Sequence, residues 1–216
     1  MLLTIGGLKG GLGKSTTAWF LGAGLARTGP TLLVDADPAS QSLFGWASQA
    51  IEAGHELPFE VQPWSTLDLG RKIRAIRDRY EHIVIDTGGE TSRLFAISCG
   101  VTHDLLVPVG PYRAELERLP ATFEAARQVE EETGEPVYPR ILLVKVDRRT
   151  LNGPQAREYL AGSGLPVMAT EVRFSVPDYA RAPGFVPDEL GDYQAVLDEL
   201  LAGDAAGAEA AAGAAT

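Results

Sequence analysis

A glycine-rich segment near the start of the chain constrains the fold more than any other feature. It covers residues 6–16 and ends in Gly13-Lys14-Ser15-Thr16. An apolar run at residues 2–5 precedes it, and a helix is expected over residues 15–27. Glycines let the backbone curl so that its N–H groups point inward, and the first turn of a following helix favours anions. The segment therefore predicts a phosphate-binding loop between a strand and a helix.

Apolar runs recur along the chain and alternate with stretches of helical character. The runs are continuous, which indicates strands covered on both faces of a parallel sheet. We therefore expect a P-loop NTPase fold of the α/β class, doubly wound, with a mostly parallel sheet and helices on both faces. The expected strands are 2–5, 31–34, 83–85, 105–109, 141–146 and 167–172. The expected helices are 15–27, 67–80, 91–99, 114–133, 154–161 and 188–201.

One domain is expected over residues 1–202. The chain has 216 residues and is 45% hydrophobic and 22% charged, which is ordinary for a globular protein. Residues 203–216 are rich in Ala and Gly, so we expect a disordered tail there. This tail lacks the basic and bulky apolar faces of a membrane-binding helix, so no membrane association is expected. The lone cysteine, Cys99, indicates a reducing cytoplasm.

The chain is acidic, with 19 basic residues against 29 acidic ones and a formal net charge of −10. Non-specific DNA binding depends mainly on phosphate neutralisation by Lys and Arg, so this balance argues against a dedicated, high-affinity nucleic-acid binder. A local basic patch remains compatible with it. The run at residues 71–79 is a candidate, but Ile73, Ile76 and Tyr80 form an apolar stripe at helical spacing, which favours a solvated outer helix face.

Each residue type in the glycine-rich loop suits a nucleoside triphosphate with its metal. Lys14 is expected to hold the β- and γ-phosphates, and the Ser15 hydroxyl is expected to bind Mg²⁺. These residues predict ATP and Mg²⁺ as cofactors. A glycine-rich turn with a chance lysine is the alternative, which the flanking strand and helix disfavour. The loop residues expected at the nucleotide are Gly10, Gly11, Leu12, Gly13, Lys14, Ser15 and Thr16.

Carboxylates follow two of the expected strands. Asp35 and Asp37 end the second strand in a segment that continues into Pro38, and Asp86 ends the third. In doubly wound sheets the carboxyl ends of the strands border the ligand crevice. One carboxylate of the first pair can orient a Mg²⁺-bound water while the other polarises the attacking water. Asp86 would hold Mg²⁺ through water. A plain Asp-Pro turn is the alternative for the first segment.

Together these motifs resemble the ParA/MinD group of ATPases, whose P-loop is of the deviant type. Residues 9–16 are similar to the family's Lys-Gly-Gly-x-Gly-Lys-Ser-Thr signature, and residues 35–38 look like its Asp-x-Asp-Pro switch I. The resemblance implies that Lys9 reaches the partner subunit's nucleotide and acts in catalysis with Lys14 and Asp37. It places Asp35 on the metal side. After the proline, where the family often has Gln, this chain has the sequence Ala-Ser-Gln-Ser.

Two later segments also resemble the family. Residues 145–150 stand where the family has Met-x-Asp-x-Arg-Thr beside the adenine, which implies that Lys145 and Asp147 lie near the nucleotide. Residues 172–177 are similar to a late Val-Arg-x-Ser-x-x-Pro stretch, with the proline one residue earlier. This second match implies that Arg173 lies near DNA.

The resemblance covers residues 2 to about 201 and is strongest to the short ParA type, which lacks an N-terminal helix-turn-helix domain. It implies plasmid or chromosome partition by a cytoplasmic, nucleoid-associated bacterial ATPase. Such an ATPase forms a homodimer on ATP, binds non-specific DNA, and hydrolyses ATP weakly until a ParB-like or small centromere-binding protein stimulates it. Two alternatives stay open: a ParA-like positioning ATPase for another cargo, such as a protein compartment, and a P-loop small-molecule ligase.

Overall fold

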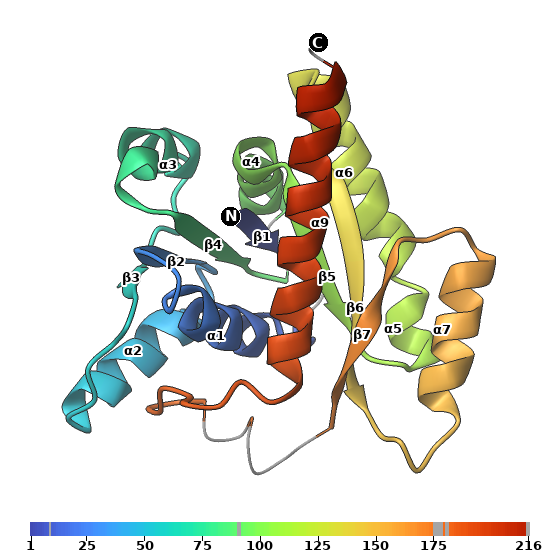
Figure 1. Ribbon diagram of the computed structural model, residues 1–216, viewed down its shortest axis with the longest axis horizontal. Coiled ribbons are helices and arrows are strands. Elements are labelled where there is room, and N and C mark those ends of the chain that lie inside the picture. The colour runs from blue at the N-terminus through green and yellow to red at the C-terminus, as the bar shows by residue number, and fades with distance from the viewer. Residues whose placement is uncertain (9, 90–91, 175–178, 180–181, 215–216) are drawn as a thin grey trace.

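Strands β2 (Thr31–Ala36) and β4 (His82–Thr87) are buried at every residue, as expected for strands with helices on both faces. They belong to a seven-stranded sheet of order β3-β2-β4-β1-β5-β6-β7 in which every neighbouring pair is parallel (Figure 1). The computed structural model describes residues 1–8, 10–89, 92–174, 179 and 182–214. The other strands are β1 (Leu2–Ile5), β3 (Glu60–Gln62), β5 (Asp104–Val109), β6 (Tyr138–Val146) and β7 (Val167–Arg173).

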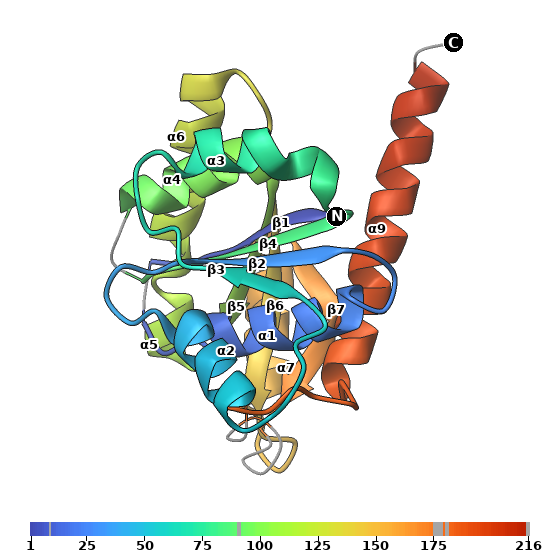
Figure 2. The ribbon, with the colours of Figure 1, turned by 90° about the vertical axis from the view of Figure 1, so that its left-hand side faces the viewer.

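Helices cover both faces of this sheet. Figure 2 shows α1 and α2 on one side and α3, α4 and α6 on the other. From β1 the chain builds β2 to β4 on one side and β5 to β7 on the other, which creates a crevice at the carboxyl ends of the central strands. The helices are α1 (Lys14–Leu25), α2 (Ser42–Glu52), α3 (Leu69–Ile76), η1 (Arg77–Arg79), α4 (Ser92–Thr102), α5 (Arg113–Leu116), α6 (Leu119–Thr133), α7 (Asn152–Gly162) and α9 (Asp192–Ala214).

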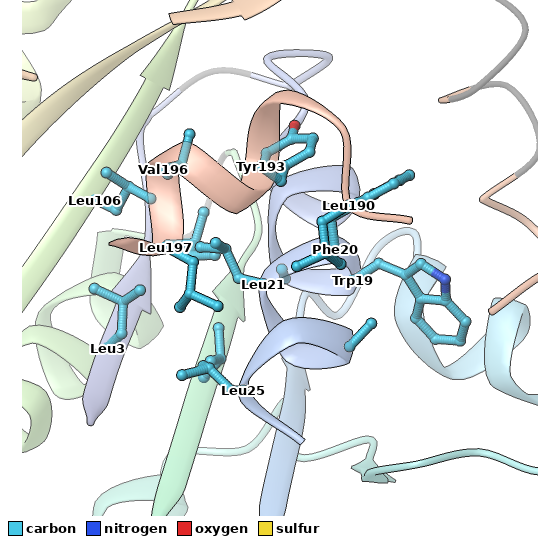
Figure 3. Packing of buried hydrophobic residues seen from close by; sticks show 14 of the residues in the cluster. Leu3, Trp19, Phe20, Leu21, Leu25, Leu106, Leu190, Tyr193, Val196 and Leu197 are labelled. Atoms are coloured by element: carbon cyan, nitrogen blue, oxygen red, sulfur yellow. The ribbon is translucent and has the colours of Figure 1, made fainter. Parts of the chain in front are cut away.

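The largest core cluster joins α1 and α9 to the sheet (Figure 3). Trp19 and Leu21 of α1 are fully buried, and Tyr193 and Leu197 of α9 lie in the same cluster. Close approach of these elements requires glycine in α1, because a Cβ on Gly24 would lie 2.7 Å from the side chain of Leu197. The core therefore holds the first helix firmly just behind the glycine-rich loop.

The predicted α/β fold with a parallel sheet is confirmed, while several element boundaries differ. Helix α2 and strand β3 were not expected. The single helix expected over residues 114–133 is divided into α5 and α6, because Pro120 lies in the first turn of α6, where its missing N–H costs nothing. Among the described residues, no helix is both long and apolar enough to cross a membrane.

The C-terminal segment also differs from the expectation. Helix α9 continues to Ala214, whereas we expected helical structure to end near residue 201 and a disordered tail to follow. Alanine has the highest helix propensity of all residues, and it dominates this segment. The low complexity that suggested disorder is thus compatible with extension of a helix that has already been nucleated in the core. The domain boundary at residue 202 stays a prediction.

Candidate nucleotide-binding site

The glycine-rich loop joins the end of β1 to the start of α1. Gly11 and Gly13 have φ values of 74° and 78°, in the left-handed region that favours glycine. Gly13 is the N-cap of α1, so the free N–H groups of the first helical turn open onto the loop. No atom lies within 4 Å of a Cβ built on Gly10 or Gly11, so this side of the loop faces open space. The loop has the backbone shape and the space that a phosphate group needs.

A cavity of about 430 Å³ opens over this loop. Residues from the loop after β2 and from the carboxyl ends of β4 and β6 also line this cavity, so it joins strands that are distant in sequence. Trp46 of α2 stands at its wall and also packs edge-on against Trp19, with ring centroids 5.9 Å apart. The lining residues are Gly10, Gly11, Leu12, Gly13, Lys14, Ser15, Thr16, Asp37, Ser40, Ser42, Trp46, Thr87, Gly89 and Lys145.

Lys14 brings a cation to the floor of this cavity. Its side chain is buried, with 7% of the residue exposed. Burial lowers the pKa of Lys14, and the carboxylates of Asp86 and Asp37 oppose this effect. A desolvated ammonium group is strongly attracted to an anion that enters the same site. The position predicted from the loop sequence therefore has the electrostatics of a phosphate contact.

Asp86 is buried directly beside the loop. It is the register partner of Ile5 at the end of β1 and of Asp35 at the end of β2. Its Oδ1 is fully buried and has no hydrogen-bond partner among the described residues. Burial raises the pKa of Asp86 to about 7, and a hydrogen bond with the Ser15 hydroxyl opposes this shift. A buried carboxylate oxygen with unused acceptor capacity is rare and calls for a ligand.

The donors near Asp86 fit a magnesium ion. The Ser15 hydroxyl and the Asp86 carboxylate are hard oxygen donors and touch each other. No group of three or more His, Cys, Asp or Glu side chains suited to a metal occurs in the part of the chain that the structure describes. Magnesium usually keeps several waters and binds substrate phosphates, so two protein oxygens at this place suffice.

Asp35 lies near the end of β2, paired in register with Asp86. Its carboxylate is fully buried beside Asp86, but both oxygens already accept backbone N–H groups: Oδ1 from Asp37 at 3.2 Å and Oδ2 from Phe44 at 3.0 Å. Burial raises the pKa of Asp35, and these hydrogen bonds oppose the shift. The carboxylate thus caps the start of α2. The predicted metal-side role of Asp35 stays a prediction, and these contacts favour Asp86 for that role.

Asp37 lies between two loops of the site. Its carboxylate lines the cavity, and a Cβ on Gly88 would lie 2.8 Å from its Oδ1. Glycine at position 88 therefore lets the loop after β4 approach the loop after β2. The structure brings Asp37, Lys14 and Ser15 to one cavity, as the sequence predicted. Lys9 lies outside the described residues, and its predicted role in catalysis stays a prediction.

Of the two later motif residues expected near the nucleotide, Lys145 lines the cavity and Asp147 does not. Lys145 lines the cavity, and its Nζ donates a hydrogen bond to the carbonyl oxygen of Gly11 at 2.5 Å. Asp147 is ion-paired instead with exposed Arg149 at 2.8 Å, and hydrogen bonds from Arg149 lower the pKa of Asp147 to about 2. Asp147 lines neither the cavity above the loop nor the smaller one beside it.

A second, smaller cavity of about 90 Å³ adjoins the first. It shares Gly13, Thr16 and Lys145 with the larger cavity, and its other walls are mostly apolar and aromatic. Arg173 borders it and forms an ion pair with Asp192 at 2.7 Å. Val172 and Phe174, which belong to the segment that resembles the family's late stretch, also line it. The sequence did not indicate the remaining lining residues, which lie outside the motifs: Val144, Tyr179 and Tyr193.

Comparison with known proteins identifies relatives along most of the chain. The "Maintenance of carboxysome distribution protein A" of Gloeobacter kilaueensis is 32% identical over 212 residues, covering 89% of this chain and 90% of the relative. The "Probable plasmid-partitioning protein ParA" of Thermus thermophilus is 29% identical, covering 86% of this chain and 71% of the relative.

Solved structures share the fold and include nucleotide complexes. An aspartate-to-alanine variant of Cyanothece McdA in complex with ATP superposes with a TM-score of 0.70 at 18% identity, covering 92% of this chain and 95% of that one. Cobyrinic acid a,c-diamide synthase from Mycobacterium smegmatis with an ATP analogue and magnesium gives 0.73 at 19% identity, covering 92% and 93%. These ligands agree with the predicted cofactors. Residues 3–183 match the CobQ/CobB/MinD/ParA nucleotide binding domain, and the chain belongs to this family.

Proposed function

We propose that this chain is an ATPase that couples the binding and hydrolysis of ATP to homodimerisation and to the positioning of a cargo. The observation that carries the proposal is the buried Lys14 in the cavity over the glycine-rich loop, next to buried Asp86, whose Oδ1 has no hydrogen-bond partner within the described part of the chain. One group suits a triphosphate and the other suits its metal. Burial of both charged groups is costly unless a ligand or partner compensates it.

Residues in and beside the cavity have separate roles in the proposed hydrolysis. Lys14 and the N–H groups of the loop bind the phosphates, while Ser15 and Asp86 hold Mg²⁺, which when bound neutralises developing phosphate charge. Asp37 accepts a hydrogen bond from the attacking water and orients it. The apolar cavity beside Thr16 receives the base. Lys9 reaches the nucleotide of a second copy, so that hydrolysis is linked to dimer formation.

A protein assembly is the first candidate for the cargo. The supporting observation is the similarity to the carboxysome distribution protein of Gloeobacter kilaueensis over 89% of this chain, at 32% identity. Plasmid or chromosome partition is the second candidate, supported by the Thermus thermophilus relative at 29% identity. In both cases non-specific DNA serves as the surface on which the ATP-bound dimer is retained. The partner that stimulates hydrolysis is a ParB-like protein, or its counterpart on the protein assembly.

We propose that Arg173 contacts DNA, as the sequence resemblance implies. In the structure its guanidinium forms an ion pair with Asp192. DNA binding through Arg173 requires the guanidinium to exchange a carboxylate for a phosphate. A gel-shift series with and without ATP and Mg²⁺, at low salt where phosphate contacts are strongest, measures DNA binding directly. Absence of any ATP-dependent shift excludes retention on DNA for both kinds of cargo.

Two further measurements test the central proposal. Calorimetry with ATP and Mg²⁺ should detect binding by the wild type and by Asp37→Ala, and none by Lys14→Ala. Light scattering should show a dimer with ATP and a monomer without it. Detection of ADP and phosphate as the sole products excludes the ligase alternative, whereas a wild-type protein that does not bind ATP contradicts the whole proposal. Loss of plasmids or dispersal of a protein assembly after deletion of the gene separates the two cargo classes.

A further inference from the structure

The loop that follows Asp37 holds the carboxylate of this residue by its own hydrogen bonds. Oδ1 accepts the backbone N–H of Ala39 at 2.9 Å and that of Ser40 at 3.4 Å. Oδ2 accepts the hydroxyl proton of Ser40 at 2.8 Å. Three donors from the next few residues therefore occupy the carboxylate on which the proposed hydrolysis depends.

Ser42 fixes the direction of the Ser40 hydroxyl. The Oγ of Ser42 donates a hydrogen bond to the Oγ of Ser40 over 3.1 Å. Since this hydrogen bond uses a lone pair of Ser40, the proton of Ser40 remains directed at Asp37. A chain of hydroxyl groups thus ends on the carboxylate, and successive hydrogen bonds in such a chain polarise one another. All three side chains line the cavity that also contains Lys14 and Ser15.

The loop after β4 also approaches the carboxylate of Asp37. A Cβ on Gly88 would lie 2.8 Å from Oδ1 of Asp37, so the carboxylate is in contact with the backbone there. Asp37 is consequently held between Gly88 and the turn at residues 39–40. A movement of the carboxylate away from this turn, toward a water in the cavity, must break the hydrogen bond from the Ser40 hydroxyl.

We propose that Ser40 is a positioning residue that restrains Asp37 and slows basal ATP hydrolysis. The inference rests on the proposed function, in which Asp37 orients the attacking water. A carboxylate that already accepts three hydrogen bonds attracts a water proton less strongly than one with a free oxygen. A partner or a second copy that draws the Ser40 hydroxyl away would release the carboxylate and stimulate turnover. Ser40 belongs to the segment after Pro38 in which this chain departs from the family pattern, so this departure would affect the rate of hydrolysis.

Steady-state hydrolysis of ATP in the presence of Mg²⁺ tests this role. Ser40→Ala should raise kcat about 3- to 10-fold, the factor expected for loss of one hydrogen bond to a charged group at a half-exposed site, with KM for ATP changed less than about twofold. Ser40→Thr keeps the hydroxyl and should retain the wild-type kcat. Ser48→Ala is the matched control, because the Ser48 hydroxyl donates to the carbonyl oxygen of Phe44 and does not touch Asp37.

Ser42→Ala provides an independent test should Ser40→Ala fail to fold. It removes the donor that orients the Ser40 hydroxyl, so kcat should rise in the same direction but less. A kcat at or below the wild-type value in the folded Ser40→Ala protein, or a rise that Ser40→Thr shares, overturns the inference. The double variant Ser40→Ala/Asp37→Ala should fall to the level of Asp37→Ala. Normal hydrolysis by Asp37→Ala alone would instead refute the proposed function of Asp37.

Discussion

The hydroxyl groups of Tyr193 and Thr17 lie 3.1 Å apart in the interior and join α9 to the first turn of α1. Thr17 also donates to the carbonyl oxygen of Gly13, at the base of the glycine-rich loop. Tyr193 stacks on Phe20, with centroids 5.0 Å apart, and lines the small cavity beside the loop. The amino-terminal turn of α9 therefore packs against α1, just behind the glycine-rich loop that is proposed to bind the nucleotide.

Tyr193→Phe should lower the free energy of unfolding by about 1 kcal/mol, because it removes one buried hydrogen bond while Thr17 keeps its second partner. Urea denaturation monitored by circular dichroism measures this change. Tyr159→Phe is the control, since Tyr159 is 55% exposed, whereas Tyr193 is buried. Equal stability of the two variants would show that the link between Tyr193 and Thr17 contributes nothing.

Gly88→Ala tests the close approach of the two loops that carry carboxylates. The new Cβ would lie 2.8 Å from Oδ1 of Asp37 and must displace that side chain or its own loop. We expect ATP hydrolysis to fall at least about tenfold, since small misplacement of a water-orienting group is costly. ATP binding measured by calorimetry should change much less. Gly162→Ala, where no atom lies within 4 Å of the Cβ, should hydrolyse ATP normally.

The parts of the site that the sequence predicts are those encoded by short local patterns. Lys14 and Ser15 follow a strand in a glycine-rich loop, and Asp86 ends an apolar run, so their convergence follows from the geometry of parallel strands. The three residues indeed meet in the structure. Burial at this edge of the sheet leaves Asp86 Oδ1 without a hydrogen-bond partner among the residues whose positions the structure describes, a property that no local sequence pattern contains.

The function of Asp35 shows where the sequence is insufficient. Its Oδ2 accepts the N–H of Phe44, nine residues later, in a helix that we did not predict. The sequence did not predict helix α2 because its apolar residues do not all lie on the buried face. Leu43 is buried, but Phe44 and Ile51 are 41% and 61% exposed, so the apolar periodicity of a helix is weak. Strand β3 has only three residues, one of them exposed, and such a short strand carries no pattern. Both α2 and β3 therefore depend on tertiary contacts that the local sequence does not reveal.

Asp86→Asn should separate stability from activity. The substitution removes a buried carboxylate whose Oδ1 lacks a partner in the described ranges of the chain, so the free energy of unfolding without nucleotide should stay the same or rise. Hydrolysis that depends on Mg²⁺ should be lost, because an amide is a poor substitute for a carboxylate near a divalent cation. Thermal unfolding and phosphate release measure the two effects. A variant that loses stability and keeps its activity would contradict the metal-side role of Asp86.

The ion pair of Arg173 with Asp192 predicts a dependence of stability on pH. Burial alone would raise the pKa of Asp192, but hydrogen bonds and charge from Arg173 outweigh it and lower the pKa. A lowered pKa in the folded state means that the stabilisation is present above the unfolded-state pKa of about 4 and is lost as pH falls through the folded-state value. Because Arg173 is half exposed, the contribution at pH 7 should be only about 0.5–1 kcal/mol.

Asp192→Asn isolates this contribution. Its free energy of unfolding should lie below that of the wild type at pH 7 and approach it as the pH falls through the lowered folded-state pKa of Asp192, where the wild-type carboxylate also becomes protonated. Added salt should narrow the difference at pH 7, because the pair is partly exposed to solvent. Gln194 and Asp198 form an exposed hydrogen bond on the same helix, so Asp198→Asn is a matched control whose stability should change little with pH. An Asp192→Asn protein that loses the same stability at both pH values would show that the carboxylate acts by packing or by its backbone contact and not by its charge.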